Sequence, residues 1–374
     1  MSGPRVAVVG ATGAVGRTML SILRERGFPA SAIVPFASER SAGRELEGAD
    51  ESVRALVDGA DLGGFDLALF SAGSGPSREW APRFAAAGAL VIDNSSAWRM
   101  DPDVPLVVPE VNPEAARDRP KGIVANPNCT MMQMVVVLAP LHAEAGLERV
   151  ILSSYQSTSG TGMAAMDELR DQAHALLHEM DAPPPQVYPH RIAFNVLPQV
   201  ETFADGDDHT TEERKVIAET RKVMGLPGLR ITATCARVPV LNCHSESVNV
   251  ELREDVSPER ARELLAAAPG VEVVDDPAAG EYPMAIHAAG RDEVLVGRIR
   301  RDPSNDRTLN LWIVGDNLRK GAALNAVQIA ELVLEHGLVG ARPAAGAQAV
   351  RVSAAASAAC SPRWRCPPGR SPAR

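Results

Sequence analysis

Short apolar runs alternate with helical stretches in the first third of the chain. Three such runs, apolar throughout as expected for strands buried on both faces, occur at Arg5–Gly10, Leu67–Phe70 and Leu90–Ile92. Helices are predicted between them, at about Val15–Arg26 and Ser77–Ala87. Another strand is predicted over Ile33–Ala37, although Pro35 favours a sheet edge or a bulge. Strands that alternate with helices predict an α/β fold with a doubly wound parallel sheet.

The pattern changes after Asn128. A helix is predicted from about Cys129, and longer strands follow at Val150–Gln156, Ile231–Pro239, Ser247–Leu252 and Thr308–Val314. Ser257–Ala267 reads as a helix with Ser257 as N-cap and Pro258 at its first position. We therefore predict a first domain at 1–127, completed by a helix within about 318–340. This helix is predicted over about 318–335, with Gly337 marking its end. An α+β second domain is predicted at 128–317.

Composition excludes several classes of protein. The chain has 374 residues, 45% of them hydrophobic, and a net charge of −9, which argues against a nucleic-acid binder. It contains no apolar run of ~18 residues, so no membrane span is expected, and no signal peptide is expected before the first strand. The five cysteines lack CxxC spacing, which indicates a reducing cytoplasm. The stretch 341–374 is rich in Ala, Pro, Ser and Arg with no acidic residue, and is predicted to be a disordered tail.

A glycine-rich loop joins the first strand to the first helix. Its residues are Gly10, Ala11, Thr12, Gly13, Ala14, Val15 and Gly16. Glycines let the backbone approach a pyrophosphate, and the helix N-terminus supplies N–H donors and a positive dipole. The spacing GxxGxxG differs from the usual GxGxxG, so a plain tight turn is the alternative. Position after an N-terminal strand favours a dinucleotide site.

The end of the second strand distinguishes NAD from NADP. NAD enzymes place an acidic residue there for the ribose hydroxyls. Here Ser38, Arg40 and Ser41 could hold a 2′-phosphate, whereas Glu39 argues for NAD. We predict NADP, with an ordinary solvated loop as the alternative.

Cys129 follows Asn126, Pro127 and Asn128 at a turn that opens a helix. A thiol at a helix N-terminus is expected to have a lowered pKa and to be a better nucleophile. The alternative is a cysteine that serves as a small buried hydrophobe, which is the role predicted for Cys235 and Cys243.

These motifs together resemble the aspartate-β-semialdehyde dehydrogenase family over about residues 4–340. The matching segments are GATGAVG at 10–16, DNSSAWRM at 93–100, VVPEVN at 107–112, NPNCT at 126–130, YQSTSGTG at 155–162, EERK at 212–215, RVPVLNCHSES at 237–247 and VGDNLRKGAALNAVQIAE at 314–331. The short segment between Gln156 and Glu212 suggests the branch typical of Gram-positive and related bacteria.

The resemblance implies catalytic roles for four residues. Cys129 would be the nucleophile that forms an acyl-thioester, and His244 the acid/base, since an imidazole titrates near neutrality. Asn128 would help polarise the thioester carbonyl through its N–H donors. Gln156 would lie beside the substrate and the thiol.

Binding roles follow from the same resemblance. Arg237 would clamp the substrate carboxylate with a bidentate guanidinium, and Glu212 would pair with the substrate ammonium. Arg99 and Lys215 would bind phosphate. From spacing alone, Glu212 and Lys215 are instead an ordinary surface ion pair on a helix. Positions near the nicotinamide would be Ser159, Gly160 and Asn317.

The resemblance implies an enzyme that reduces L-aspartyl-4-phosphate to L-aspartate-4-semialdehyde with NADP, in lysine, methionine, threonine and diaminopimelate biosynthesis. A homodimer is expected, without metal, nucleic acid or membrane. His174 and His178 lie four apart on a predicted helix, but no third ligand is evident. The alternatives are a related acyl-phosphate reductase, such as N-acetylglutamyl phosphate reductase, and a non-catalytic NADP-sensing Rossmann protein.

Overall fold

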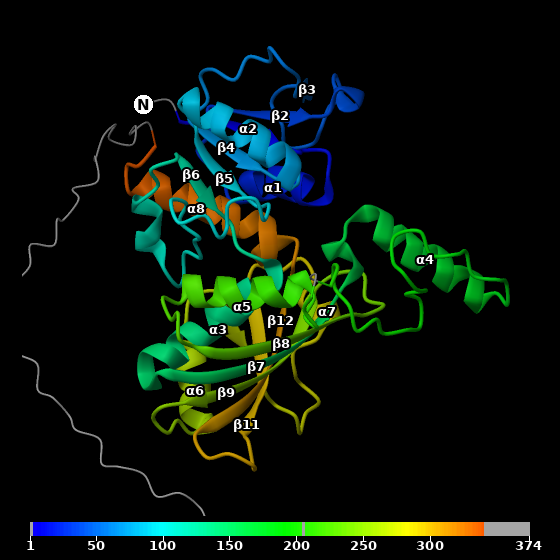
Figure 1. Cartoon of the computed structure of the whole chain (residues 1–374), viewed down its shortest axis with the longest axis vertical. Helices are drawn as coiled ribbons and strands as arrows, with labels where there is room; N and C mark the ends of the chain where they lie inside the picture. Colours follow the sequence, from blue (N-terminus) through cyan, green and yellow to red (C-terminus); the bar gives the residue numbers. More distant parts are fainter. Residues whose placement is uncertain (1–2, 204–205, 340–374) are drawn as a thin grey trace, which may run out of the picture. The chain divides into compact units, whose positions relative to one another are not determined.

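The first sheet of the protein is fully parallel. The computed structural model describes residues 3–203 and 206–339 (Figure 1). Six strands pair in the order β3-β2-β1-β4-β5-β6. They are β1 (Arg5–Val9), β2 (Ala32–Ala37), β3 (Arg54–Ala55), β4 (Leu67–Phe70), β5 (Leu90–Asp93) and β6 (Ile123–Ala125). This order is that of a dinucleotide-binding Rossmann sheet, so the predicted doubly wound fold is confirmed.

Helices cover both faces of this sheet. They are α1 (Ala14–Glu25), α2 (Ser74–Ala86) and α8 (Leu324–Glu335). On β1, Val6 and Val8 pack into the core formed with α1 and α8, whereas Ala7 and Val9 pack into the core formed with α2. The last helix therefore packs back on the first sheet, as predicted (Figure 1). It starts later than predicted, because a π-helical turn, η4 (Arg319–Ala323), precedes it.

Pro35 lies inside β2, the second strand of the sheet. Its missing N–H is tolerated because the outer neighbour β3 is only two residues long and pairs with Phe36 and Ala37 alone. At Pro35 the strand is thus paired on one side only, through Val8 of β1. At Pro35, β2 is therefore an edge strand, as the proline predicted.

The second sheet is mixed and has the order β10-β11-β12-β9-β7-β8. Its strands are β7 (Leu147–Gln156), β8 (Arg230–Arg237), β9 (His244–Leu252), β10 (Val271–Val273), β11 (Val294–Arg301) and β12 (Thr308–Gly315). Contacting helices are α3 (Cys129–Ala145), α5 (Thr211–Val223) and α6 (Pro258–Ala266). Further helices are α4 (Met163–Leu177) and α7 (Ala285–Ala288), and 3-10 turns are η1 (Glu39–Ser41), η2 (Pro113–Arg117) and η3 (Thr158–Gly160). Ser257 caps α6 as predicted, with its side chain accepting the Arg260 N–H.

The chain leaves the first sheet at the Asn128 turn, since β6 ends at Ala125 and α3, which packs on the second sheet, begins at Cys129. The domain limits 1–127 and 128–317 themselves stay predictions. None of the helices in the described part of the chain is long and apolar enough to cross a membrane. The predicted tail, 341–374, lies outside the described residues.

Candidate active site

A cleft of about 730 Å³ opens over the N-terminus of α3. The predicted site residues that line it are Val15, Arg99, Asn128, Cys129, Gln156, Ser159, Gly160, Glu212, Lys215, Arg237 and Asn317. They lie in helices, at the ends of strands β7 and β8, and in the segments between these elements. Predicted residues from seven separate motifs are therefore brought to one place.

Cys129 and His244 form a side-chain pair at this cleft. Cys129 is the first residue of α3 and is partly exposed, whereas His244 opens β9 and is fully buried. Cys129 Sγ lies 3.3 Å from His244 Nε2. This distance is suitable for exchange of a proton between the thiol and the ring.

The other ring nitrogen of His244 is held by Ser157, a residue not identified from the sequence. The backbone N–H of Ser157 donates to Nδ1 at 3.1 Å, and Ser157 Oγ also lies 3.1 Å from Nδ1. Ser157 Oγ in turn donates to Asn317 Oδ1 at 3.0 Å. The N–H contact suits a ring with its proton on Nε2, whereas Oγ can accept from a ring protonated at Nδ1 at the expense of that contact.

The electrostatics of the pair correct one prediction. Burial and then the Glu212 carboxylate raise the pKa of Cys129 to about 12, against the opposing effect of Arg99 and Arg237. Burial and then the Arg237 guanidinium lower the pKa of His244 to about 3. The expected lowering of the thiol pKa by the helix N-terminus is therefore wrong for the free protein, in which both groups are neutral.

Glu212→Gln should make Cys129 more reactive towards an alkylating agent, even if turnover falls. An anion beside the thiol disfavours the thiolate, so its removal lowers the thiol pKa and raises the thiolate fraction at pH 8. We expect the rate of iodoacetamide labelling to rise about three- to tenfold. Mass spectrometry of the Cys129 peptide measures this, with Glu213→Gln as control. An unchanged or lower rate would contradict it.

Asn128 acts differently from the prediction. Its side-chain oxygen caps α3 by accepting the N–H groups of Thr130 and Met131. Its own backbone N–H donates to Glu219 Oε2 at 2.6 Å, and its amide donates to Glu212 at 2.9 and 3.0 Å. These donors are already used within the protein, so the expected oxyanion role of Asn128 is not supported, and the residue instead orders the turn before Cys129.

Glu212 is buried, with 4% of its surface exposed, and lines the cleft. It accepts hydrogen bonds from Asn128 and from Gln156 Nε2, the latter at 3.1 Å. The predicted alternative, a surface ion pair between Glu212 and Lys215, is wrong. Lys215 is paired with Glu201 instead, at 2.6 Å.

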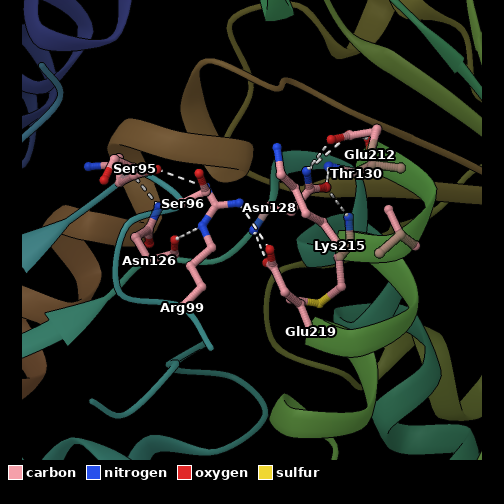
Figure 2. A network of polar contacts seen from close by, with 12 residues as sticks. Ser95, Ser96, Arg99, Asn126, Asn128, Thr130, Glu212, Lys215 and Glu219 are labelled. Carbon is pink, nitrogen blue, oxygen red and sulfur yellow. Dashed lines mark hydrogen bonds and ion pairs between the residues drawn. The ribbon is translucent and has the colours of Figure 1, made fainter. Parts of the chain in front are cut away.

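Arg99 occupies the opposite side of the Asn128 turn and is 9% exposed (Figure 2). It donates to the carbonyls of Asn126 and Asn94, at 3.0 and 2.7 Å, and to Glu219 Oε1 at 3.1 Å. A guanidinium has five N–H groups, so these three bonds leave two. Glu219 was not identified from the sequence.

Arg237 ends β8 and is buried. Its Nη1 donates to the carbonyl of Ser157 at 2.7 Å, whereas its Nε has no hydrogen-bond partner among the described residues. A Cβ added at Gly160 would lie 3.0 Å from Arg237 Nη1 and 3.2 Å from His244 Nε2. Gly160 therefore allows the guanidinium and the imidazole to share one side of the cleft.

The glycine-rich loop has the close packing that a dinucleotide site requires. Gly10 has φ +85°, and a Cβ there would lie 2.4 Å from the Ser71 carbonyl oxygen. A Cβ on Gly16 would lie 2.3 Å from the Gly10 carbonyl oxygen, so only glycine lets α1 approach β1. Gly13 is the N-cap of α1 and supplies no side-chain acceptor, which leaves the first N–H groups of the helix available to a ligand.

Several predicted cofactor residues do not line the cleft. Val15 is the one residue of the glycine-rich loop that lines the cleft, and the predicted residues that do not are Gly10, Thr12, Gly13, Ala14 and Gly16. Ser38, Arg40 and Ser41 follow β2 at the same carboxyl edge of the sheet, where Ser38 and Arg40 are exposed. In the residues that the structure describes, no group of three or more His, Cys, Asp and Glu could hold a metal ion.

Comparisons with known proteins agree with this geometry. Residues 5–119 match the family model "Semialdehyde dehydrogenase, NAD binding domain", and residues 138–320 match "Semialdehyde dehydrogenase, dimerisation domain". The chain is 54% identical to the aspartate-semialdehyde dehydrogenase of Aquifex aeolicus, over 90% of this chain and 100% of that one. It is 51% identical to the enzyme of Streptomyces akiyoshiensis, over 88% and 98%.

A solved structure shows the same fold. Aspartate semialdehyde dehydrogenase II of Vibrio cholerae, complexed with ASA, is 44% identical and superposes with a TM-score of 0.86, covering 90% of this chain and 99% of that one. The predicted family is confirmed by full-length relatives as well as by the cysteine–histidine cleft. The chain belongs to the aspartate-semialdehyde dehydrogenase family, the oxidoreductases that reduce aspartyl phosphate to aspartate semialdehyde in amino-acid biosynthesis.

Proposed function

We propose that this chain reduces L-aspartyl-4-phosphate to L-aspartate-4-semialdehyde through a thioester on Cys129, with NADP as the cofactor. The observation that carries this proposal is the contact between Cys129 Sγ and His244 Nε2, 3.3 Å, within a cleft that also holds Arg99, Arg237 and Glu212. The product supplies lysine, methionine, threonine and diaminopimelate biosynthesis.

Cys129 forms and releases the acyl group. Its sulfur attacks the acyl carbon of the substrate, the carbon–oxygen bond to phosphate breaks, and a thioester remains. NADPH, when bound, supplies the hydride that reduces this carbon. His244 then gives a proton to the oxygen and takes it back as the thiohemiacetal collapses to aldehyde and thiol. Ser157 keeps the ring in place while its protonation changes.

Substrate charges also favour the reactive form of the pair. An ammonium beside Glu212 would offset the carboxylate that raises the pKa of Cys129. A carboxylate beside Arg237 would offset the guanidinium that lowers the pKa of His244. Both effects favour transfer of the thiol proton to the ring. Binding of the amino-acid part therefore promotes formation of the nucleophile.

Phosphate would bind between Arg99 and Lys215, which both line the cleft, as Cys129 does. Arg99 has two N–H groups beyond the three already bonded. Lys215 is paired with Glu201 and would share or exchange this partner when phosphate binds. The backbone N–H of Cys129, at the first position of α3, is suited to the thioester oxygen.

NADP should be preferred over NAD because Arg40, Ser38 and Ser41 directly follow β2, where dinucleotide-binding folds recognise the ribose or its 2′-phosphate. A charge-assisted hydrogen bond to phosphate contributes ~1.5–3 kcal/mol, about ten- to a hundredfold in affinity. Dissociation constants for NADPH and NADH, measured with the wild-type chain and with Arg40→Ala, test this. We expect Arg40→Ala to weaken NADPH alone. Equal constants in the wild-type chain would reject the preference.

We also propose a homodimer, since a family dimerisation model covers most of the second domain. The assignment to the Gram-positive branch rests on the short segment between Gln156 and Glu212 and stays a proposal.

The main function is tested by NADPH formation from aspartate semialdehyde, NADP and phosphate. N-acetylglutamate semialdehyde is the matched alternative substrate, because its blocked amine cannot pair with Glu212. Preference for the acetylated aldehyde would overturn the proposal.

A further inference from the structure

Helix α5 presents three charged side chains towards the Asn128 turn. Glu212, Lys215 and Glu219 are spaced by three and four residues, so they share one face of the helix. Glu212 and Lys215 line the cleft, whereas Glu219 lies beneath it and is 1% exposed. A carboxylate so deeply buried needs hydrogen-bond or ion-pair partners that offset the free-energy cost of its desolvation.

The two oxygens of Glu219 have different partners (Figure 2). Oε1 lies 3.1 Å from Arg99 Nη1, and Oε2 accepts the backbone N–H of Asn128 at 2.6 Å. Arg99 is one of the two proposed phosphate-binding residues, and Asn128 precedes the nucleophile Cys129. One carboxylate thus connects the anion-binding group to the start of the helix that carries the thiol.

We propose that Glu219 is a positioning residue for the phosphate step: it holds the Arg99 guanidinium at a fixed place relative to Cys129. This inference rests on the proposed function, in which phosphate attacks or leaves the acyl group on Cys129. Phosphate and thioester react only when their atoms are aligned, and a displacement of about 1 Å can cost roughly a hundredfold in rate.

A carboxylate suits this position better than an amide does. Arg99 and Asn128 both present N–H donors, so both need an acceptor. A glutamine offers one oxygen and one NH₂ group. Whichever way the amide turns, one of the two contacts becomes donor against donor. Glu219→Gln therefore keeps the size of the side chain but loses one of the two hydrogen bonds, so Arg99 and Asn128 are no longer held by the same side chain.

The experiment separates hydride transfer from phosphate use. Oxidation of aspartate semialdehyde without phosphate acylates Cys129 and gives a burst of NADPH equal to the number of active sites. Turnover beyond the burst needs phosphate. For Glu219→Gln we expect the burst rate to change less than about threefold and the KM for phosphate to rise about tenfold or more. Glu219→Asp, which keeps two oxygens on a shorter stem, should give a smaller rise.

Glu213→Gln is the matched control. Glu213 lies on the same helix, is 8% exposed, and also uses each oxygen for a different donor, in its case the backbone N–H groups of Thr210 and Cys235. Both variants are expected to lower the thermal midpoint, but Glu213→Gln should leave the KM for phosphate unchanged.

A phosphate KM within twofold of wild type for both Glu219 variants would overturn the inference, as would an equal rise in Glu213→Gln. If Glu219→Gln does not fold, Glu219→Asp decides alone. A wild-type chain whose turnover does not depend on phosphate would instead overturn the proposed function.

Discussion

Cys129→Ser should lower turnover by at least about a thousandfold while leaving cofactor binding unchanged. An alkoxide is much harder to form than a thiolate, and in this cleft burial and Glu212 already oppose the anion at residue 129. Oxygen is also the poorer leaving group from an acyl-enzyme. The serine side chain is smaller than cysteine, so α3 should begin at the same residue with the same Asn128 cap.

The measurement has two parts. Steady-state NADPH formation gives the loss of turnover, and quenching of intrinsic fluorescence by NADPH gives the dissociation constant. Cys235→Ser is a suitable comparison, because Cys235 is buried in β8 away from the cleft lining. Turnover of Cys129→Ser within tenfold of wild type would contradict a nucleophilic role.

The strongly apolar strands of the fold were predictable from local pattern. β1, β4 and β5 are continuous apolar runs because helices cover both faces of their sheet. The strands that were missed are β3, β6, β10 and β11. The first three are two or three residues long, too short for any period to show, and β11 ends in alternating arginines that resemble a solvated loop.

Eleven of the residues that line the cleft were predicted, and most of their roles came from the family resemblance rather than from local pattern. The supporting residues were not. Glu219 looks like any charged residue on a helix, and Ser157 looks like any serine after a strand. Their importance depends on contacts with Asn128, Arg99 and His244, which are distant in the sequence and meet only in the folded chain.

The pKa of Cys129 shows the limit of local reasoning most clearly. The helix N-terminus, which is local, favours a thiolate. Burial and the carboxylate of Glu212, which come from tertiary structure, oppose it and prevail. Sequence position therefore singled out Cys129 for a reason that does not hold in the free protein.

Arg237→Lys should reduce kcat/KM by about ten- to a thousandfold, although the charge is conserved. Arg237 uses Nη1 to bond the Ser157 carbonyl at 2.7 Å, and its Nε is buried with no hydrogen-bond partner in the part of the chain that the structure describes. The guanidinium can keep this anchor and still offer N–H groups to a substrate carboxylate. An ammonium is a point charge on a flexible stem, so it would lose either the anchor or the bidentate contact.

The position of Arg237 makes the loss specific to the substrate. A shifted carboxylate would also shift the aldehyde carbon away from Cys129 and His244, whose side chains are in contact. The NADPH dissociation constant should stay the same, because the cofactor loop belongs to the other sheet. Arg230→Lys is the control on the same strand, where the exposed arginine pairs with Glu148 and Glu251 and does not line the cleft. Near-wild-type kinetics for Arg237→Lys, with an unchanged thermal midpoint, would show that Arg237 is a structural cation. A fall in kcat/KM confined to Arg237→Lys would indicate that Arg237 binds the substrate carboxylate.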